Sequence, residues 1–333
     1  MTTGTPGSSD HRRLGVVGTL VWDTIHGRDA TRDAPVEEWG GIAYALSAFE
    51  AAGPRGWTLV PIIKVGKDMQ GRARELLDGL ERVGSLEGVR FVDEPNNRVE
   101  LRYRDAGERT ERLSGGVPGW SREELVPLAA SCDALYVNFI AGWEMDLPVA
   151  RRLRDVVGGP VYADLHSLFL DVGPGGVRRS RRLDEGAEWV SCFDFVQVNE
   201  DELGLLAGPG TDPWETARQL VADGRTRAVL VTLGDRGARW AATPELAEAG
   251  GGGSGGVVDG EEPVSESVDD PDPTGCGDVW GITCFGSLLS GDPVHGAVRR
   301  ANRLAARNAR RRGGRAVAET GDAGRTLETG EGT

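Results

Sequence analysis

Short apolar runs recur along the chain and are separated by longer stretches with a helix-like spacing of apolar residues. The runs cover residues 14–20, 59–65, 134–140, 161–163, 195–198 and 229–233. Strand-like runs that alternate with helical segments are typical of a parallel sheet whose connections are helices lying on both faces. The pattern therefore predicts an α/β fold with a mainly parallel central sheet between two helical layers.

The stretch 89–114 departs from this pattern. Residues 97–104 and 108–113 alternate between apolar and polar around a turn at Asp105, Ala106 and Gly107. Alternation on both sides of a glycine-containing turn predicts a hairpin with one polar face. We expect this stretch and residues 24–39 to form a small lid inserted in a domain that spans residues 14–318.

Three polar segments lie outside the predicted core. Residues 1–13 and 319–333 are expected to be flexible tails. Residues 249–256 are nearly all glycine and serine, a composition also found in phosphate-binding loops. No Lys-Ser or Lys-Thr pair and no helix follows this stretch, so a flexible insertion is the favoured interpretation.

Composition limits the classes of function. The 333 residues suffice for one large domain, and 38 basic against 52 acidic residues give a net charge of −14. This charge disfavours binding to nucleic acid or to an anionic membrane. No apolar run is long enough to span a bilayer, and the four cysteines lack metal-ligand spacing. A soluble, cytoplasmic protein with reduced thiols is expected.

The run from Asp272 to Asp278 carries the strongest chemical signal. It contains a Gly-x-Gly turn and precedes an apolar segment rich in small residues, as expected of a buried helix. The amides of Gly275, Cys276 and Gly277 would lie at the N-terminus of that helix, where a phosphate is stabilised. Asp278, in the first turn, could accept a proton from an attacking hydroxyl. The plainer alternative is a helix cap in which the aspartate only complements the helix dipole.

This run resembles the second signature of the PfkB (ribokinase-like) carbohydrate kinases, D-x-T-G-A-G-D, with Cys276 where the family most often has alanine. The motifs described below follow the family's order over nearly the whole chain. The resemblance implies a ribokinase-like three-layer sandwich with a small β lid. It also implies a kinase that uses ATP and Mg²⁺, with Asp278 as the general base and the Gly275–Gly277 turn as an anion hole.

Two segments near the N-terminus are similar to the family's acceptor-binding motifs. Residues 39–46 resemble the Gly-Gly motif, so the resemblance implies that Gly40 and Gly41 contact the acceptor. Asp23 stands where relatives hold sugar hydroxyls with a carboxylate. A simple helix entry and a turn-capping aspartate are the alternatives. Ala45 replaces an asparagine of many relatives, which leaves ribose-type recognition open.

Residues Asn199 and Glu202 match the family's N-x-x-E motif. The resemblance implies that they organise the phosphates and a magnesium ion, which Glu202 would contact through water, since Mg²⁺ keeps several of its waters. A capping cluster at the start of a helix is the alternative. The run Asp164 to His166 stands where relatives often have D-x-N, so His166 is a candidate for contact with substrate or phosphate, beside a purely structural histidine.

The remaining nucleotide-site residues lie in two segments. Residues 231–238 resemble the family's V-T-L-G-x-x-G-A, which implies that Thr232, Gly234 and Gly237 contribute to the nucleotide site. A plain hairpin would have the same pattern. Asn302 lies in the helical stretch that lines the adenine pocket of relatives.

The sequence thus predicts an enzyme that phosphorylates a hydroxyl group of a small sugar or polyol. A nucleoside kinase of the same family is an alternative, in which Trp22 and Trp39 would stack on the base. Packing of both residues in the core or the lid is an equal interpretation. A catalytically silent relative that senses a sugar or nucleotide is a second alternative. A Rossmann oxidoreductase is disfavoured because no G-x-G-x-x-G follows the first predicted strand. The identity of the acceptor and a homodimer formed through the lid stay open.

Overall fold

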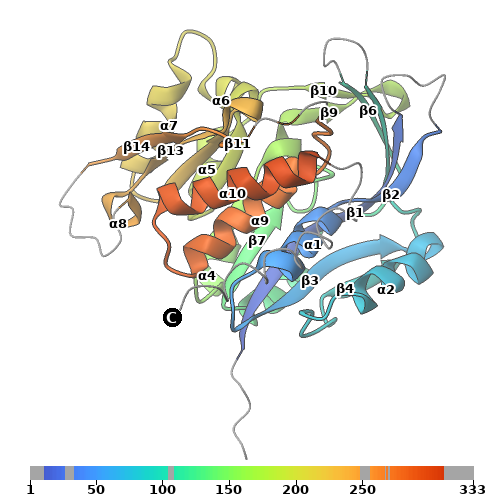
Figure 1. Ribbon diagram of the computed structural model, residues 1–333. Helices are drawn as coiled ribbons and strands as arrows, with labels where there is room; N and C mark the ends of the chain where they lie inside the picture. The colour runs from blue at the N-terminus through green and yellow to red at the C-terminus, as the bar shows by residue number, and fades with distance from the viewer. Residues whose placement is uncertain are drawn as a thin grey trace, which may run out of the picture.

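Strands and helices alternate along the chain and form one large sheet with helices on both faces (Figure 1). The structure is a computed structural model that describes residues 11–26, 34–103, 109–247, 256–266, 268 and 271–310. The predicted glycine-rich insertion, the turn of the predicted hairpin and the C-terminal tail therefore lie outside the described residues, wholly or for the most part.

The central sheet is parallel except at one edge, where β13 pairs antiparallel with both of its neighbours, β12 and β14. In spatial order its strands are β14 (Val258–Glu262), β13 (Ala238–Ala242), β12 (Ala228–Thr232), β11 (Phe195–Asn199), β8 (Val161–Asp164), β7 (Ala134–Asn138), β1 (Arg12–His26), β3 (Trp57–Gly66) and β4 (Val89–Val92). The middle strands are buried on both faces, which is why they read as continuous apolar runs in the sequence.

Two hydrophobic clusters cover the two faces of this sheet. One cluster contains side chains of α1 (Ile42–Ala52), α2 (Gln70–Asp78), α9 (Cys276–Leu289) and α10 (Val294–Ala309). The other contains side chains of α3 (Arg122–Ala130), α4 (Leu147–Val156), α5 (Gly186–Ser191), α6 (Glu200–Ala207) and α7 (Pro213–Ala222). A short helix, α8 (Pro244–Ala247), follows β13. The result is the predicted three-layer sandwich.

Helix α9 is the central helix of its layer. It packs against α10 and α1, and nearly all of its side chains from Val279 to Ser287 are buried. A helix that is apolar all round is stable only when it is covered on every side. Its N-terminus consequently has a fixed position at the carboxyl ends of the parallel strands.

The lid is a small sheet built on the outer half of β1. That half pairs antiparallel with β2 (Val36–Gly41) and parallel with β5 (Arg98–Tyr103), which pairs antiparallel with β6 (Arg109–Ser114). Its inner face carries a third, small apolar cluster, formed by Val21, Ile25, Val99, Leu101 and Leu113. The mainly parallel sheet and the small β lid are thus confirmed.

A second hairpin lies beside the lid. Its strands are β9 (Leu170–Val172) and β10 (Arg178–Ser180), and a β-bridge joins Val177 to Arg112 of β6. This hairpin connects the body of the protein to the lid at the side away from β2 (Figure 1).

The first strand is longer than the sequence indicates. Leu14–Leu20 was the predicted run, whereas β1 extends from Arg12 to His26. The extra length arises because residues beyond Leu20 leave the central sheet and pair with β2 and β5 instead. Asp23 therefore lies within a strand of the lid and not in a loop after the strand.

Within the described residues, no helix combines the length and apolar character that crossing a bilayer requires.

Candidate active site

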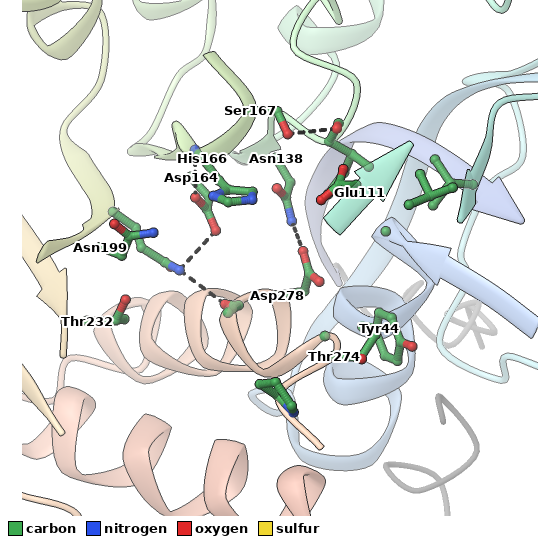
Figure 2. A pocket seen from close by; sticks show the side chains of 18 of the residues that line it. Tyr44, Glu111, Asn138, Asp164, His166, Ser167, Asn199, Thr232, Thr274 and Asp278 are labelled. Carbon is green, nitrogen blue, oxygen red and sulfur yellow. Dashed lines mark hydrogen bonds between the residues drawn. The ribbon is translucent and has the colours of Figure 1, made fainter. Parts of the chain in front are cut away.

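A cavity of about 290 Å³ lies where the carboxyl ends of the parallel strands, the N-terminus of α9 and the inner face of the lid meet. Of the residues predicted from the sequence, it brings together Asp23, Gly41, Asn199, Glu202, Thr232, Gly275, Gly277 and Asp278. It does not include Gly40, Cys276, Gly234, Gly237 or Asn302 in its lining. Figure 2 shows Thr274 and Asp278 beside the start of α9, with Asn138 hydrogen-bonded directly to Asp278 and Asp164 nearby.

Asp278 lies in the first turn of α9, as predicted. Nδ2 of Asn138, at the end of β7, donates a hydrogen bond of 2.6 Å to Oδ1 of Asp278. Asn138 is almost fully buried, so this bond is shielded from water and fixes the orientation of the carboxylate. The strand end and the helix start are thereby joined at the reactive group.

The three amides of the predicted anion hole are not equivalent. The amide of Cys276 donates to the carbonyl of Pro273 within the turn, at 3.2 Å. The Cys276 thiol points into the protein, 3.6 Å from the carbonyls of Asp272 and Ala305, and burial raises its pKa to about 11. Gly275 and Gly277 are the members of the turn that line the cavity.

Glycine is required at position 275 for two reasons. Its φ of 71° lies in the left-handed region, and a Cβ there would lie 2.4 Å from Cγ of Tyr44. The ring of Tyr44 therefore packs directly on the turn, and its hydroxyl donates to Oε1 of Glu38 at 2.9 Å. Burial, with the charges of Asp23 and Glu38, raises the pKa of Tyr44 far above its ordinary value, so the phenol stays neutral.

The Gly-Gly motif makes room for Asp23. A Cβ on Gly40 would lie 1.8 Å from Oδ2 of Asp23, so the carboxylate occupies the space that any other residue would fill. Gly41 is the N-cap of α1 with φ of 58°, again in the left-handed region. Asp23 is 3% exposed and lines the cavity on the lid side.

Asn199 and Glu202 form a complete capping box at the start of α6. Oδ1 of Asn199 accepts from the Glu202 amide at 2.9 Å, and Oε2 of Glu202 accepts from the Asn199 amide at 2.8 Å. The capping alternative is therefore realised, yet both side chains also line the cavity. Nδ1 of His166 lies 2.5 Å from Oε1 of Glu202, so three polar groups meet at this wall.

The buried carboxylate of Asp164 lies next to this group. Oδ2 of Asp164 accepts from Nε2 of Gln197 at 2.9 Å, and Oδ1 accepts from the amide of His166 at 3.1 Å. Burial, with the nearby charge of Glu202, raises the pKa of Asp164 to about 7. The same Nε2 of Gln197 donates to the carbonyl of Gly277 at 3.1 Å, which ties the first turn of α9 to the sheet (Figure 2).

The donor set fits a magnesium ion held partly through water. Among the described residues, no group of three histidine, cysteine or acidic side chains is close enough to enclose a metal ion directly. Mg²⁺ keeps several waters and needs one or two carboxylates. Asp164 and Glu202 supply two buried carboxylates at the cavity wall. Burial and then the negative charge of Glu202 raise the pKa of Asp164, and a bound cation would offset that negative charge.

The remaining predicted nucleotide-site residues lie in β12, in the turn that follows it and in α10. Thr232, the last residue of β12, lines the cavity. Gly234 and Gly237 form the turn between β12 and β13, with φ of 64° and 106°, so this segment is a hairpin. Asn302 is buried away from the cavity: it accepts from Nε1 of Trp280 at 2.8 Å and donates to the Glu262 carbonyl at 2.7 Å.

Several residues of the cavity were not predicted. Asn138, Gln197, Tyr44 and Glu111 all line it. Asn138 at the end of one apolar strand and Gln197 inside another were visible in the sequence as polar residues within apolar runs. For Trp22 and Trp39, stacking on a base and packing in the core or the lid were equal alternatives. The two rings pack on each other edge to face and are not part of the cavity lining.

Comparison with known proteins gives a family match for part of the chain and the fold of the whole. Residues 177–321 match the profile described as pfkB family carbohydrate kinase. No curated protein matches the chain by sequence.

Solved structures resemble the chain over nearly its whole length. The Burkholderia thailandensis nucleoside kinase in complex with inosine has a TM-score of 0.68 at 18% identity, covering 92% of this chain and 94% of its own. The Arabidopsis thaliana ribokinase complexed with ribose and ATP has a TM-score of 0.66 at 18% identity, covering 93% and 98%. A pyrophosphate-dependent kinase in the ribokinase family, complexed with a pyrophosphate analogue and myo-inositol, has a TM-score of 0.66 at 18% identity, covering 90% and 96%. The ribokinase-like fold is therefore confirmed.

The raised pKa of Asp164 predicts a pH-dependent stability. Between about pH 4 and pH 7 the folded state holds a proton on Asp164 that the unfolded state has lost, so stability falls as pH rises through this window. Relative to Asp164→Asn, the unfolding free energy of the wild type should fall by up to about 1.4 kcal/mol per pH unit. Urea unfolding of both proteins at pH 5, 6 and 7 measures this, and parallel curves would contradict the assignment.

The packing of Gly275 on Tyr44 predicts that Gly275→Ala is destabilising. The left-handed backbone alone costs an alanine about 1–2 kcal/mol, and the displaced ring adds to this. Gly71→Ala in α2 is the matched control, because a Cβ there meets no atom within 4 Å. The midpoint of thermal unfolding should fall for the first variant and stay level or rise for the second. Equal midpoints would show that the turn tolerates a side chain.

Proposed function

We propose that the protein transfers the γ-phosphoryl group of ATP to a hydroxyl group of a small sugar or polyol, with Mg²⁺ as cofactor. One observation carries this proposal: the Asp278 carboxylate lies at the N-terminus of a buried helix and faces a cavity that holds polar groups at both ends. The PfkB family domain and the ribokinase-like fold support it.

Asp278 acts as the general base on the acceptor hydroxyl. The bond from Asn138 holds its carboxylate toward the cavity, so a hydroxyl between Asp278 and the lid lies within reach of proton transfer. Asp23, on the lid side of the same cavity, binds the acceptor by accepting hydrogen bonds from its hydroxyl groups.

The N-terminal turn of α9 stabilises the charge of the transferred group. The helix N-terminus and the backbone of Gly275 and Gly277 face the cavity, where they favour an anion. Asn199 and Glu202 orient the phosphates and the hydrated ion, and when bound the ion neutralises charge on the phosphate oxygens.

The lid excludes water from the reaction. Val21, Val99 and Leu101 of its inner face line the cavity directly above the polar groups. An apolar cover strengthens the electrostatic interactions beneath it and prevents water from competing with the acceptor.

A nucleoside is the second candidate acceptor. The same apolar face of the lid offers a surface on which a base could lie, and a nucleoside kinase in complex with inosine has this fold.

The test is incubation with ATP or pyrophosphate as donor, Mg²⁺ and a panel of sugars, cyclitols and nucleosides, with product detected by mass spectrometry. Phosphorylation of no member of the panel with either donor would contradict the proposal.

Loss of the base predicts loss of chemistry without loss of nucleotide binding. Asp278→Asn should lower kcat by about 10²- to 10⁴-fold, the range typical of general-base catalysis, and leave the Kd of ATP nearly unchanged. Asp292→Asn, an exposed aspartate after the C-terminus of the same helix, is the matched control and should keep wild-type turnover. Turnover of Asp278→Asn close to wild type would remove Asp278 from this role.

Substitutions at the two ends of the cavity should have different kinetic effects. Glu202→Gln keeps a side chain that can form the capping box but removes its charge, so it should shift the Mg²⁺ dependence and lower kcat. Asp23→Ala should mainly raise the acceptor KM, because each lost hydrogen bond to a carboxylate is worth about 1.5–3 kcal/mol. Initial rates with Mg²⁺ and acceptor varied independently measure both effects. If Asp23→Ala changed the Mg²⁺ dependence and Glu202→Gln changed the acceptor KM, the acceptor and the phosphates would bind at the opposite ends of the cavity.

A further inference from the structure

Glu111 brings a second lid carboxylate to the cavity. It lies on β6, opposite Leu101 of β5, and shares the inner face of the lid with Leu113. Its side chain is 15% exposed and lines the cavity. Figure 2 shows Glu111 on the same side of the cavity as Asn138 and Ser167, across from Tyr44 and Asp278.

The position of Glu111 is set by a buried arginine. Nη1 of Arg178, from β10, lies 3.6 Å from Oε1 of Glu111, and the Arg178 side chain is 1% exposed. Nη1 and Nη2 also donate to the carbonyls of Ile140 and Ala141, at 3.0 and 3.1 Å. Because these donors are directed at backbone carbonyls, the guanidinium is a fixed support for Glu111 and not an open receptor for an anion.

The loop that supplies these carbonyls is itself rigid. The carboxylate of Glu144 is buried and accepts hydrogen bonds from the amides of Ile140, Ala141 and Gly142 at 2.7–2.9 Å. The Thr19 hydroxyl of β1 donates to it as well, at 2.9 Å. The chain of contacts from β1 through Glu144 and Arg178 therefore holds Glu111 in place.

The part of the cavity between the lid and Asp278 is rich in hydrogen-bond acceptors. Carboxylates of Asp23, Glu111 and Asp278 line it. The hydroxyls of Tyr44 and Ser167 also line it, but they already donate to Glu38 and to the Ile140 carbonyl. Oδ1 of Asn138 is buried and has no hydrogen-bond partner among the described residues. No lysine or arginine is present among the described residues that line this cavity. Such walls match a ligand that offers hydroxyl donors, whereas a phosphate or carboxylate offers only more acceptors and negative charge.

We infer that the acceptor carries no phosphate or carboxylate group, and that Glu111 is the residue that binds its hydroxyl groups and rejects anionic analogues. This inference rests on the proposed function and narrows its acceptor class. Like charges brought together in a partly desolvated site are strongly unfavourable, so an anionic analogue should react with a kcat/KM at least about 100-fold lower than its neutral parent.

The test uses the full chain with matched pairs of compounds. Each pair joins a neutral polyol, sugar or nucleoside to its monophosphate or its acid: ribose with ribose 5-phosphate, fructose with fructose 6-phosphate, glucose with gluconate, myo-inositol with its monophosphate, inosine with its monophosphate. Binding is measured by calorimetry without nucleotide, and turnover with ATP and Mg²⁺. We expect binding and turnover only for neutral members.

The variant Glu111→Gln removes the negative charge of this side chain and leaves its size nearly unchanged. It should raise the KM of the neutral acceptor by about 10-fold, raise the kcat/KM of the anionic partner, and leave the KM of ATP unchanged. Glu100→Gln is the matched control, because Glu100 lies on β5 with its side chain beside Arg102 and His26 and outside the cavity lining. A merely structural role of Glu111 would change the KM of ATP and the melting temperature but not the selectivity ratio.

The outcomes separate this inference from the proposed function. Neutral members that bind but are not phosphorylated would overturn the kinase function and support the acceptor class. Phosphorylation of an anionic member in preference to its neutral parent would support the kinase function and overturn the inference. Unchanged selectivity in Glu111→Gln, or binding of no member of any pair, would also overturn it.

Discussion

The hydrogen bonds of one buried amide, that of Gln197, join the central sheet to the first turn of α9 at the cavity. Nε2 of Gln197 donates to Asp164 and to the carbonyl of Gly277, while its Oε1 accepts from the hydroxyl of Tyr162 at 2.7 Å. A Cβ on Gly281 would lie 2.4 Å from the same oxygen, so α9 can approach only because that position is glycine. A satisfied buried network of this kind specifies a single arrangement. The place of Asp278 follows from it.

The first strand couples this site to the lid. The last pair that β1 makes with β3 joins Thr19 to Lys64, and the next residue, Leu20, already pairs with Gly41 of β2. The carboxylate of Asp23 therefore lies just beyond the point where the strand passes from the central sheet into the lid. Because Glu144 binds the Thr19 hydroxyl at this junction, the loop after β7 and the lid are fixed to one another.

The sequence predicted the chemistry at the motif positions better than the contacts between them. The turn before α9 was identified because its glycines and aspartate have a clear physical purpose at a helix N-terminus. The extension of β1 was not identified, because the continuous apolar run ends near Val21. After that point, buried and partly exposed residues alternate along the strand. Strand pairing at such a junction depends on partners far away in the chain, which local patterns do not encode.

The same reason explains the residues that were missed. Glu111 is an ordinary charged residue in an alternating strand, and its place at the cavity depends on how the lid folds over the strand ends. Gln197 was more accessible to sequence reasoning, since a polar side chain inside an apolar parallel strand must find partners when buried. Asn199 and Glu202 had two interpretations from the sequence, as a helix cap and as part of a phosphate site. The two roles are compatible in the structure, because the capping residues also line the cavity.

The two ends of the cavity differ in hydrogen-bonding character, and Asp278 lies at their boundary. The lid end presents carboxylates and an amide oxygen, which accept, whereas the α9 end presents a helix N-terminus, which donates and favours negative charge. A hydroxyl compound and a phosphate would therefore be drawn to opposite ends of one space. Asp278, the proposed general base, lies between the two ends. In the proposed function, the direction of a single buried helix therefore sets the orientation of both substrates.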